Sequence, residues 1–122
     1  MDTDIIIPIY NAFDFTKKCI ETVIEHTDLT KHTLLLINDK STDQRILPLL
    51  NLFTTEYPSL NITIINNESN QGFVRTVNIG MQHSSRDVVL LNSDTEVTKN
   101  WLPKIQTVSY THLRAHETLS DL

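Results

Sequence analysis

The stretch VVLLNSDTE, residues 88–96, decides the fold class. Its first half, Val88–Leu91, is a short apolar run of the kind found in a buried strand. Its second half, Asn92–Glu96, consists entirely of residues with side-chain oxygens. Open α/β sheets bind ligands beyond the carboxyl ends of their strands, and hard oxygen ligands suit Mg²⁺ or Mn²⁺ bound to a phosphate. The stretch therefore predicts an α/β fold with a site at this strand end; alternatively, Asp94 or Thr95 only caps the next helix.

Three similar apolar runs precede this stretch and alternate with segments of helical spacing. The runs, rich in β-branched residues, are Ile5–Ile7, Thr33–Ile37 and Ile62–Ile65, and the helical segments lie near 13–26, 44–56 and 72–83. Continuous apolar character indicates strands that are covered on both faces. The order therefore predicts a doubly wound, mainly parallel sheet in which the first strand lies between the second and the fourth.

Each helical segment has an apolar face that we expect to pack on the sheet. The three faces comprise Phe15, Cys19, Ile20, Val23 and Ile24; Ile46, Leu49, Leu50 and Phe53; and Phe73, Val74, Val77 and Met81. Pro48 lies inside the second segment, so the regular helix is expected to begin close to it.

The overall composition limits the function classes. A chain of 122 residues is long enough for one domain. The net charge of −5, with no cluster of Lys and Arg, argues against nucleic-acid binding. Cys19 is the only cysteine and is expected to be a small core residue. No apolar run approaches the ~18 residues of a membrane span, so we expect no transmembrane segment and a cytoplasmic location.

The segment 108–122 differs from the rest, because its polar residues show no sustained period. It resembles translated sequencing-adapter DNA, so we divide the chain into residues 1–107, a ligand-binding part, and 108–122, a non-native or disordered tail. His112 and His116 have the spacing of a metal pair on a helix, but nothing around them completes a site.

Two more strand ends carry polar residues, Tyr10 and Asn11 in the segment 8–11 and the cluster at 38–43. Asp39 comes just after an apolar strand, so its carboxylate is expected at the rim of the sheet, where it could accept the imide N–H of uracil or thymine. Alternatively, Asp39 and Asp43 form turns or cap the next helix. We favour binding for Asp39 and capping for Asp43.

Four segments together identify a family. They are DIIIPIYN (4–11), INDKSTD (37–43), NQGFVRTVNIG (70–80) and LLNSDTEV (90–97). In order and spacing they resemble the family 2 glycosyltransferases of GT-A fold, over residues 4–105. The chain lacks both GxxxxGK[ST] and GxGxxG, and its two glycines, Gly72 and Gly80, cannot build either phosphate loop.

The resemblance implies a set of site residues. Those implied to bind the nucleotide are Pro8, Ile9, Tyr10, Asn11, Asp39, Asn70, Gly72, Arg75, Asn92 and Ser93. Asp94, with Glu96 as a supplement, would bind Mg²⁺ or Mn²⁺, and Asn92 replaces the first Asp of the family's Asp-x-Asp motif. Gly72 also suits a tight turn into a helix. Asn78 and Gly80 have two possible roles: they complete the nucleotide-binding motif of segment 70–80, or they allow the helix to pack closely.

The implied function is that of the N-terminal, donor-binding part of a hexosyl- or rhamnosyltransferase. The donor would be a UDP-, dTDP- or GDP-sugar, and the acceptor a glycan or lipid-linked glycan. In this family the catalytic base and the acceptor-binding half follow the metal motif, so no catalytic residue is identified and this truncated chain is expected to be incomplete for catalysis.

Two further expectations follow. The full-length protein would be cytoplasmic or peripheral at the membrane, and the exposed edge of the fourth strand would favour self-association. The alternative function is a non-catalytic α/β nucleotide-binding module or an inert truncated remnant.

Overall fold

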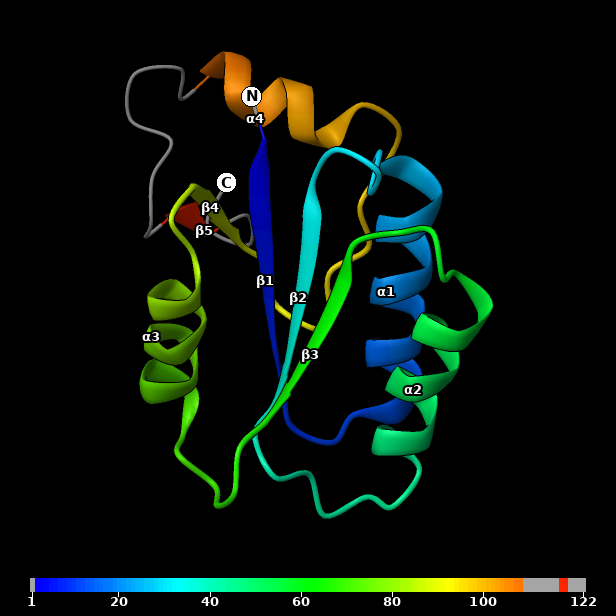
Figure 1. Ribbon diagram of the computed structural model, residues 1–122, viewed down its shortest axis with the longest axis vertical. Helices are drawn as coiled ribbons and strands as arrows, with labels where there is room; N and C mark the ends of the chain where they lie inside the picture. The colour runs from blue at the N-terminus through cyan, green and yellow to red at the C-terminus, as the bar shows by residue number, and fades with distance from the viewer. Residues whose placement is uncertain (1, 109–116, 119–122) are drawn as a thin grey trace.

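The protein is a parallel sheet covered on both faces by helices, as the computed structural model in Figure 1 shows for residues 2–108 and 117–118. The strand order is β3-β2-β1-β4-β5, and every neighbouring pair is parallel. The elements in chain order are β1 (Thr3–Ile9), α1 (Phe13–His26), β2 (Thr33–Asn38), α2 (Ile46–Glu56), β3 (Ile62–Asn66), α3 (Phe73–His83), β4 (Asp87–Leu90), α4 (Trp101–Val108) and β5 (Glu117–Thr118). The predicted doubly wound α/β fold, with β1 between β2 and β4, is confirmed.

The side chains of the strands alternate between the two faces of the sheet, so the protein has one hydrophobic core on each face. Ile5, Ile7 and Ile9 of β1 pack with residues of α1, α2 and α4, whereas Ile6 packs on the other face with Val77 of α3. Successive side chains of a strand point to opposite faces, so a strand buried on both faces must be apolar throughout. This explains the uninterrupted apolar runs in the sequence.

Local signals set the helix starts. Pro48 lies in the first turn of α2, where its missing N–H has no intrahelical partner to lose. Gly72, directly before α3, has φ +86°, a conformation that favours glycine. The three predicted helical segments are confirmed within two residues at each end.

The predicted apolar faces of α1 and α3 are wrong in the first turn of each helix. Phe15 is 63% exposed, Phe73 55% and Val74 69%. The two helices begin beyond the carboxyl ends of the strands, so their first turns have little sheet to pack on. Phe15 and Phe73 line a pocket instead.

The outer edge of β4 is partly covered. Glu117 and Thr118 of β5 pair with Val89 and Leu90, so the prediction of an unpaired edge on the fourth strand is incorrect at those two residues. Residues 109–116 and 119–122, and with them His112 and His116, lie outside the described residues. In the described part of the chain no helix is long and apolar enough to span a membrane.

Candidate functional site

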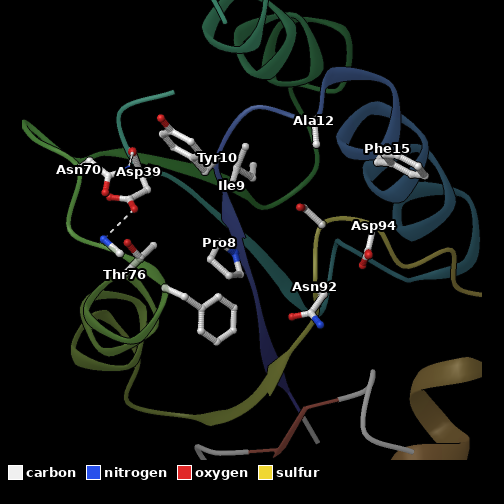
Figure 2. A pocket seen from close by; sticks show the side chains of 13 residues that line it. Pro8, Ile9, Tyr10, Ala12, Phe15, Asp39, Asn70, Thr76, Asn92 and Asp94 are labelled. Atoms are coloured by element: carbon white, nitrogen blue, oxygen red, sulfur yellow. Dashed lines mark hydrogen bonds between the residues drawn. The ribbon is translucent and has the colours of Figure 1, made fainter. Parts of the chain in front are cut away.

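A pocket of about 710 Å³ opens at the carboxyl ends of β1, β2 and β4, beside the first turns of α1 and α3 (Figure 2). Because β1 is the middle of these three strands, Asp39 after β2 and Asp94 after β4 lie on opposite sides of the pocket, with Pro8 and Ile9 between them. The lining residues are Pro8, Ile9, Tyr10, Ala12, Phe15, Asp39, Asn70, Gly72, Phe73, Thr76, Asn92, Ser93 and Asp94.

The carboxylate of Asp39 is the main hydrogen-bond acceptor in one wall of the pocket. Its Oδ1 accepts hydrogen bonds from the backbone N–H of Gln71 (2.7 Å) and from the Asn67 side-chain amide (2.9 Å). Its Oδ2 accepts the backbone N–H of Gly72 (3.0 Å). Burial by itself raises the pKa of Asp39, but the N–H donors of Gln71, Asn67 and Gly72 outweigh it and hold that pKa below its ordinary value. Asp39 is therefore an ionised acceptor that also ties the start of α3 to the end of β2.

Asn67 is a site residue that the sequence reasoning missed. It is buried directly after β3, and its amide donates both to Asp39 Oδ1 and to the Thr76 hydroxyl (3.2 Å). Its backbone N–H donates to the carbonyl of Asn38 (2.9 Å). The sequence feature that could have identified Asn67 is the one used for Asp39, a polar residue just after an apolar strand.

The opposite wall is the loop after β4, which is held against α1. The thiol of Cys19 contacts the carbonyl of Asn92 at 3.6 Å, and the backbone N–H of Val97 donates to the Thr22 hydroxyl at 3.1 Å. Burial, together with the nearby acidic groups of this loop, raises the pKa of Cys19 to about 12, so the thiol stays protonated. As predicted, Cys19 is a buried core residue.

The pocket is rich in oxygen and poor in positive charge. Among the residues that the structure describes, Asp39 and Asp94 are the carboxylates that line it, and no Lys, Arg or His does. The described residues also contain no cluster of three or more His, Cys, Asp or Glu able to hold a metal. Asp94 lies in the same wall as Asn92 and Ser93, so one carboxylate and neutral side-chain oxygens, the type of atom that Mg²⁺ binds, line this side of the pocket.

Three predicted site residues do not line the pocket. Asn11 instead links two loops, because its amide donates to Thr42 Oγ1 and its Oδ1 accepts the N–H of Asp43, both at 2.9 Å. Arg75 and Glu96 are exposed outside the pocket. The spacing of the motifs along the chain does not encode which of their residues line the pocket.

The other predicted site residues are brought together by the fold. They are Pro8, Ile9, Tyr10, Asp39, Asn70, Gly72, Asn92, Ser93 and Asp94. The sequence reasoning missed Ala12, Phe15, Phe73 and Thr76, which lie in or next to the first turns of α1 and α3. For two of these, Phe15 and Phe73, apolar character and helical spacing predict a position in the core instead.

The family model described as glycosyl transferase family 2 matches residues 4–112. A curated relative, the uncharacterized glycosyltransferase YwdF of Bacillus subtilis (strain 168), is 26% identical over 117 residues, which cover 92% of this chain and 41% of the relative.

Two solved structures have a similar fold. TarS of S. aureus, in complex with UDP-GlcNAc, aligns with a TM-score of 0.73 and 21% identity over 92% of this chain and 32% of that one. The mannosyltransferase PcManGT from Pyrobaculum calidifontis, in complex with GDP-Man and Mn²⁺, aligns with a TM-score of 0.69 and 19% identity over 75% of this chain and 27% of that one. The chain thus spans less than half the length of each of these three proteins.

Proposed function

Because the chain belongs to glycosyl transferase family 2 and has the GT-A fold, we propose that its pocket binds the nucleoside diphosphate of a sugar donor. The observation that carries the proposal is the placement of Asp39 and Asp94 on opposite sides of one pocket of about 710 Å³. This volume lies within the range of about 300–1,000 Å³ that is usual for small-molecule sites. The site also lies where doubly wound sheets bind nucleotides, beside the reversal of strand order at β1 and β4.

In this proposal the base binds on the Asp39 side. The ionised carboxylate accepts an N–H from the base, and Tyr10, 47% exposed, offers an aromatic face to a planar ring. Asn70 joins the same wall, since its side-chain amide donates to the backbone carbonyl of Asp39 at 3.2 Å. An imide N–H such as that of uracil or thymine suits a lone carboxylate acceptor.

The diphosphate binds toward Asp94. A pocket with two carboxylates and no cation repels a diphosphate, so binding requires a positive ion between the phosphates and the protein. Asp94, Asn92 and Ser93 supply hard oxygens for Mg²⁺ or Mn²⁺, and the phosphates would complete its coordination. When bound, such a cation would neutralise the charge that develops on the departing diphosphate.

We also propose that the described residues bind a donor without transferring its sugar efficiently. An inverting transfer needs a base to take the proton of the acceptor hydroxyl. The lowered pKa of Asp39 makes it a weak base, and Asp94 is committed to the cation. Among the described residues no third carboxylate lines the pocket. The base, and the site for a glycan or lipid-linked glycan acceptor, would then belong to parts of the protein outside this pocket.

Calorimetric titration tests the proposal, with UDP, dTDP and GDP each added with and without Mn²⁺. At least one nucleotide should bind, more tightly with Mn²⁺ than without it. If none of the three binds under either condition, the donor-binding proposal is wrong.

The same absence of a base favours a second function, a non-catalytic nucleotide-binding module. Incubation with the matching nucleotide-sugar and a panel of glycosides tests this second function. Release of the nucleoside diphosphate together with a glycosylated product identifies a transferase and excludes the binding module. Tight binding without product is the result expected both for a binding module and for the donor-binding part of a transferase.

A further inference from the structure

Resting on the proposed function, we propose that Asn67 is a positioning residue for base recognition, which acts by holding the Asp39 carboxylate toward the bound nucleotide. Asn67 itself does not line the pocket, and it acts through Asp39. Its role would be to keep one carboxylate in one orientation in both the free and the bound protein.

The geometry shows why one amide can do this. The side-chain nitrogen of Asn67 donates to two partners, Asp39 Oδ1 at 2.9 Å and Thr76 Oγ1 at 3.2 Å. The Asn67 backbone is fixed in turn by its N–H bond to the Asn38 carbonyl at 2.9 Å. The amide therefore joins the ends of β2 and β3 to the first turn of α3.

The chemistry of this network favours a functional role over a general stabilising one. Every group that holds the carboxylate is neutral: the backbone N–H groups of Gln71 and Gly72, the Asn67 amide and the Thr76 hydroxyl. An ion pair would neutralise the carboxylate, whereas neutral donors leave it with its full charge. A preoriented, charged acceptor binds an N–H at a lower entropic cost than one that must be ordered on binding.

The nearest asparagine provides a matched control. Asn66 precedes Asn67 and is exposed, and its side-chain oxygen accepts the Asn38 amide at 3.2 Å without any contact to Asp39. Asn66→Ala therefore removes an amide from the same strand end but leaves the Asp39 network intact.

The first measurement needs no nucleotide. The pKa of the Asp39 carboxyl is followed by NMR in the parent, Asn67→Ala and Asn66→Ala. We expect it to rise in Asn67→Ala and to stay at the parent value in Asn66→Ala. An unchanged pKa in Asn67→Ala would show that Asn67 does not hold Asp39, and the inference would fail. If Asn67→Ala does not fold, Asn67→Leu makes the same test, because it keeps the approximate size of the side chain and removes the amide donor to Asp39.

The second measurement compares the affinity of each variant for UDP with that for inorganic pyrophosphate, both in Mn²⁺. Asn67→Ala should weaken the binding of UDP by up to about tenfold, because the Asp39 side chain must then be ordered on binding, and should leave the binding of pyrophosphate unchanged. Asn67→Gln, which keeps the amide donor, should recover part of the loss. Equal losses for the two ligands would mean that Asn67 only stabilises the start of α3, which contradicts the inference. If the parent binds neither ligand, the proposed function fails, while the NMR result still decides whether Asn67 holds Asp39.

Discussion

Gly80 of α3 lies directly against Ile37 of β2, so closely that a Cβ on the glycine would stand 2.6 Å from Ile37 Cδ1. Ile6 of β1 is also near, with two of its atoms 3.0 Å from the same point, and both isoleucines are fully buried. The glycine thus lets α3 approach the sheet at the level of its second core. Of the two roles considered for Gly80, the structure supports helix packing.

Gly80→Ala should destabilise the protein even though alanine favours helices. Overpacking a filled core costs about 1–3 kcal/mol, whereas the gain in helix propensity is only about 1 kcal/mol. We expect a net loss of about 1 kcal/mol in the free energy of unfolding, measured with urea. Asn78→Ala, an exposed change in the same helix, is the control and should be neutral or slightly stabilising. A stabilised Gly80→Ala would show that the isoleucines move aside easily.

Asp39→Ala should weaken both binding and stability. Loss of the charged acceptor should lower the affinity for uridine or thymidine nucleotides roughly 10- to 100-fold. The N–H donors of Gln71, Gly72 and Asn67 also lose their partner, so the free energy of unfolding should fall by about 2–3 kcal/mol. Calorimetry and urea unfolding measure the two effects. Unchanged nucleotide affinity in a folded variant would exclude Asp39 as a base acceptor.

Asp94→Asn should remove the metal-dependent part of nucleoside diphosphate binding and leave nucleoside binding almost unchanged. The variant keeps the shape of the side chain but loses the charge that Mg²⁺ or Mn²⁺ requires. Titration of UDP and of uridine, each with and without Mn²⁺, measures the difference. Glu96→Gln is the matched control, since Glu96 is exposed outside the pocket and should change nothing. Metal dependence that survives in Asp94→Asn but is lost in Glu96→Gln would reverse our assignment.

His32 should make the stability depend on pH. The neutral imidazole accepts the backbone N–H of Thr3 at its Nδ1 (3.1 Å), and burial, followed by the charge of Lys31, lowers its pKa. A lowered pKa means that folding favours the neutral form. The contribution of neutral His32 to the free energy of unfolding is therefore complete above about pH 6.5, the pKa of histidine in the unfolded chain. It is lost as the pH falls through the lower pKa of His32 in the folded protein.

Urea unfolding across this pH range, compared with His32→Asn, measures the effect. The asparagine keeps an acceptor that does not titrate, so the loss of stability on acidification should become smaller. His83→Gln, at an exposed position, should leave the pH dependence as it is. Identical profiles for the parent and His32→Asn would contradict the prediction.

Removal of residues 109–122 should have little effect on stability. The segment before them is anchored by the buried Trp101, Leu102 and Ile105, and the Trp101 indole N–H donates to Thr27 Oγ1 at 2.8 Å. Of the residues that the structure describes, the deletion removes Glu117 and Thr118 and so the two-residue pairing of β5, and we expect the melting temperature to fall by less than about 5 °C. A larger fall would mean that the removed residues pack on the core.

The same deletion should increase self-association, because the whole edge of β4 becomes unpaired. Sedimentation velocity of the shortened and the parent protein measures this effect.

The sequence by itself determined the elements from β1 to β4 and their order, whereas α4 and β5 were not predicted. Runs such as Ile5–Ile7 and Val88–Leu91 predict strands buried on both faces, and alternation with helical spacing leads to a doubly wound sheet. This topology places Asp39, after β2, and Asp94, after β4, at the same edge of the sheet on either side of β1, so the location of the pocket also followed from the sequence. These features are predictable because they depend on local periodicity and on general rules of chain connection.

Only the tertiary structure decided which side chains meet. Asn11 contacts Thr42 instead of the pocket, Glu96 lies outside it, and Phe15 is exposed where its spacing indicated the core. Asn67 and Asp39 are 28 residues apart in the chain, and their hydrogen bond exists because parallel strands end side by side. Spacing along the chain specifies the face of a helix or strand, but the partner of a side chain depends on the element that packs against that face.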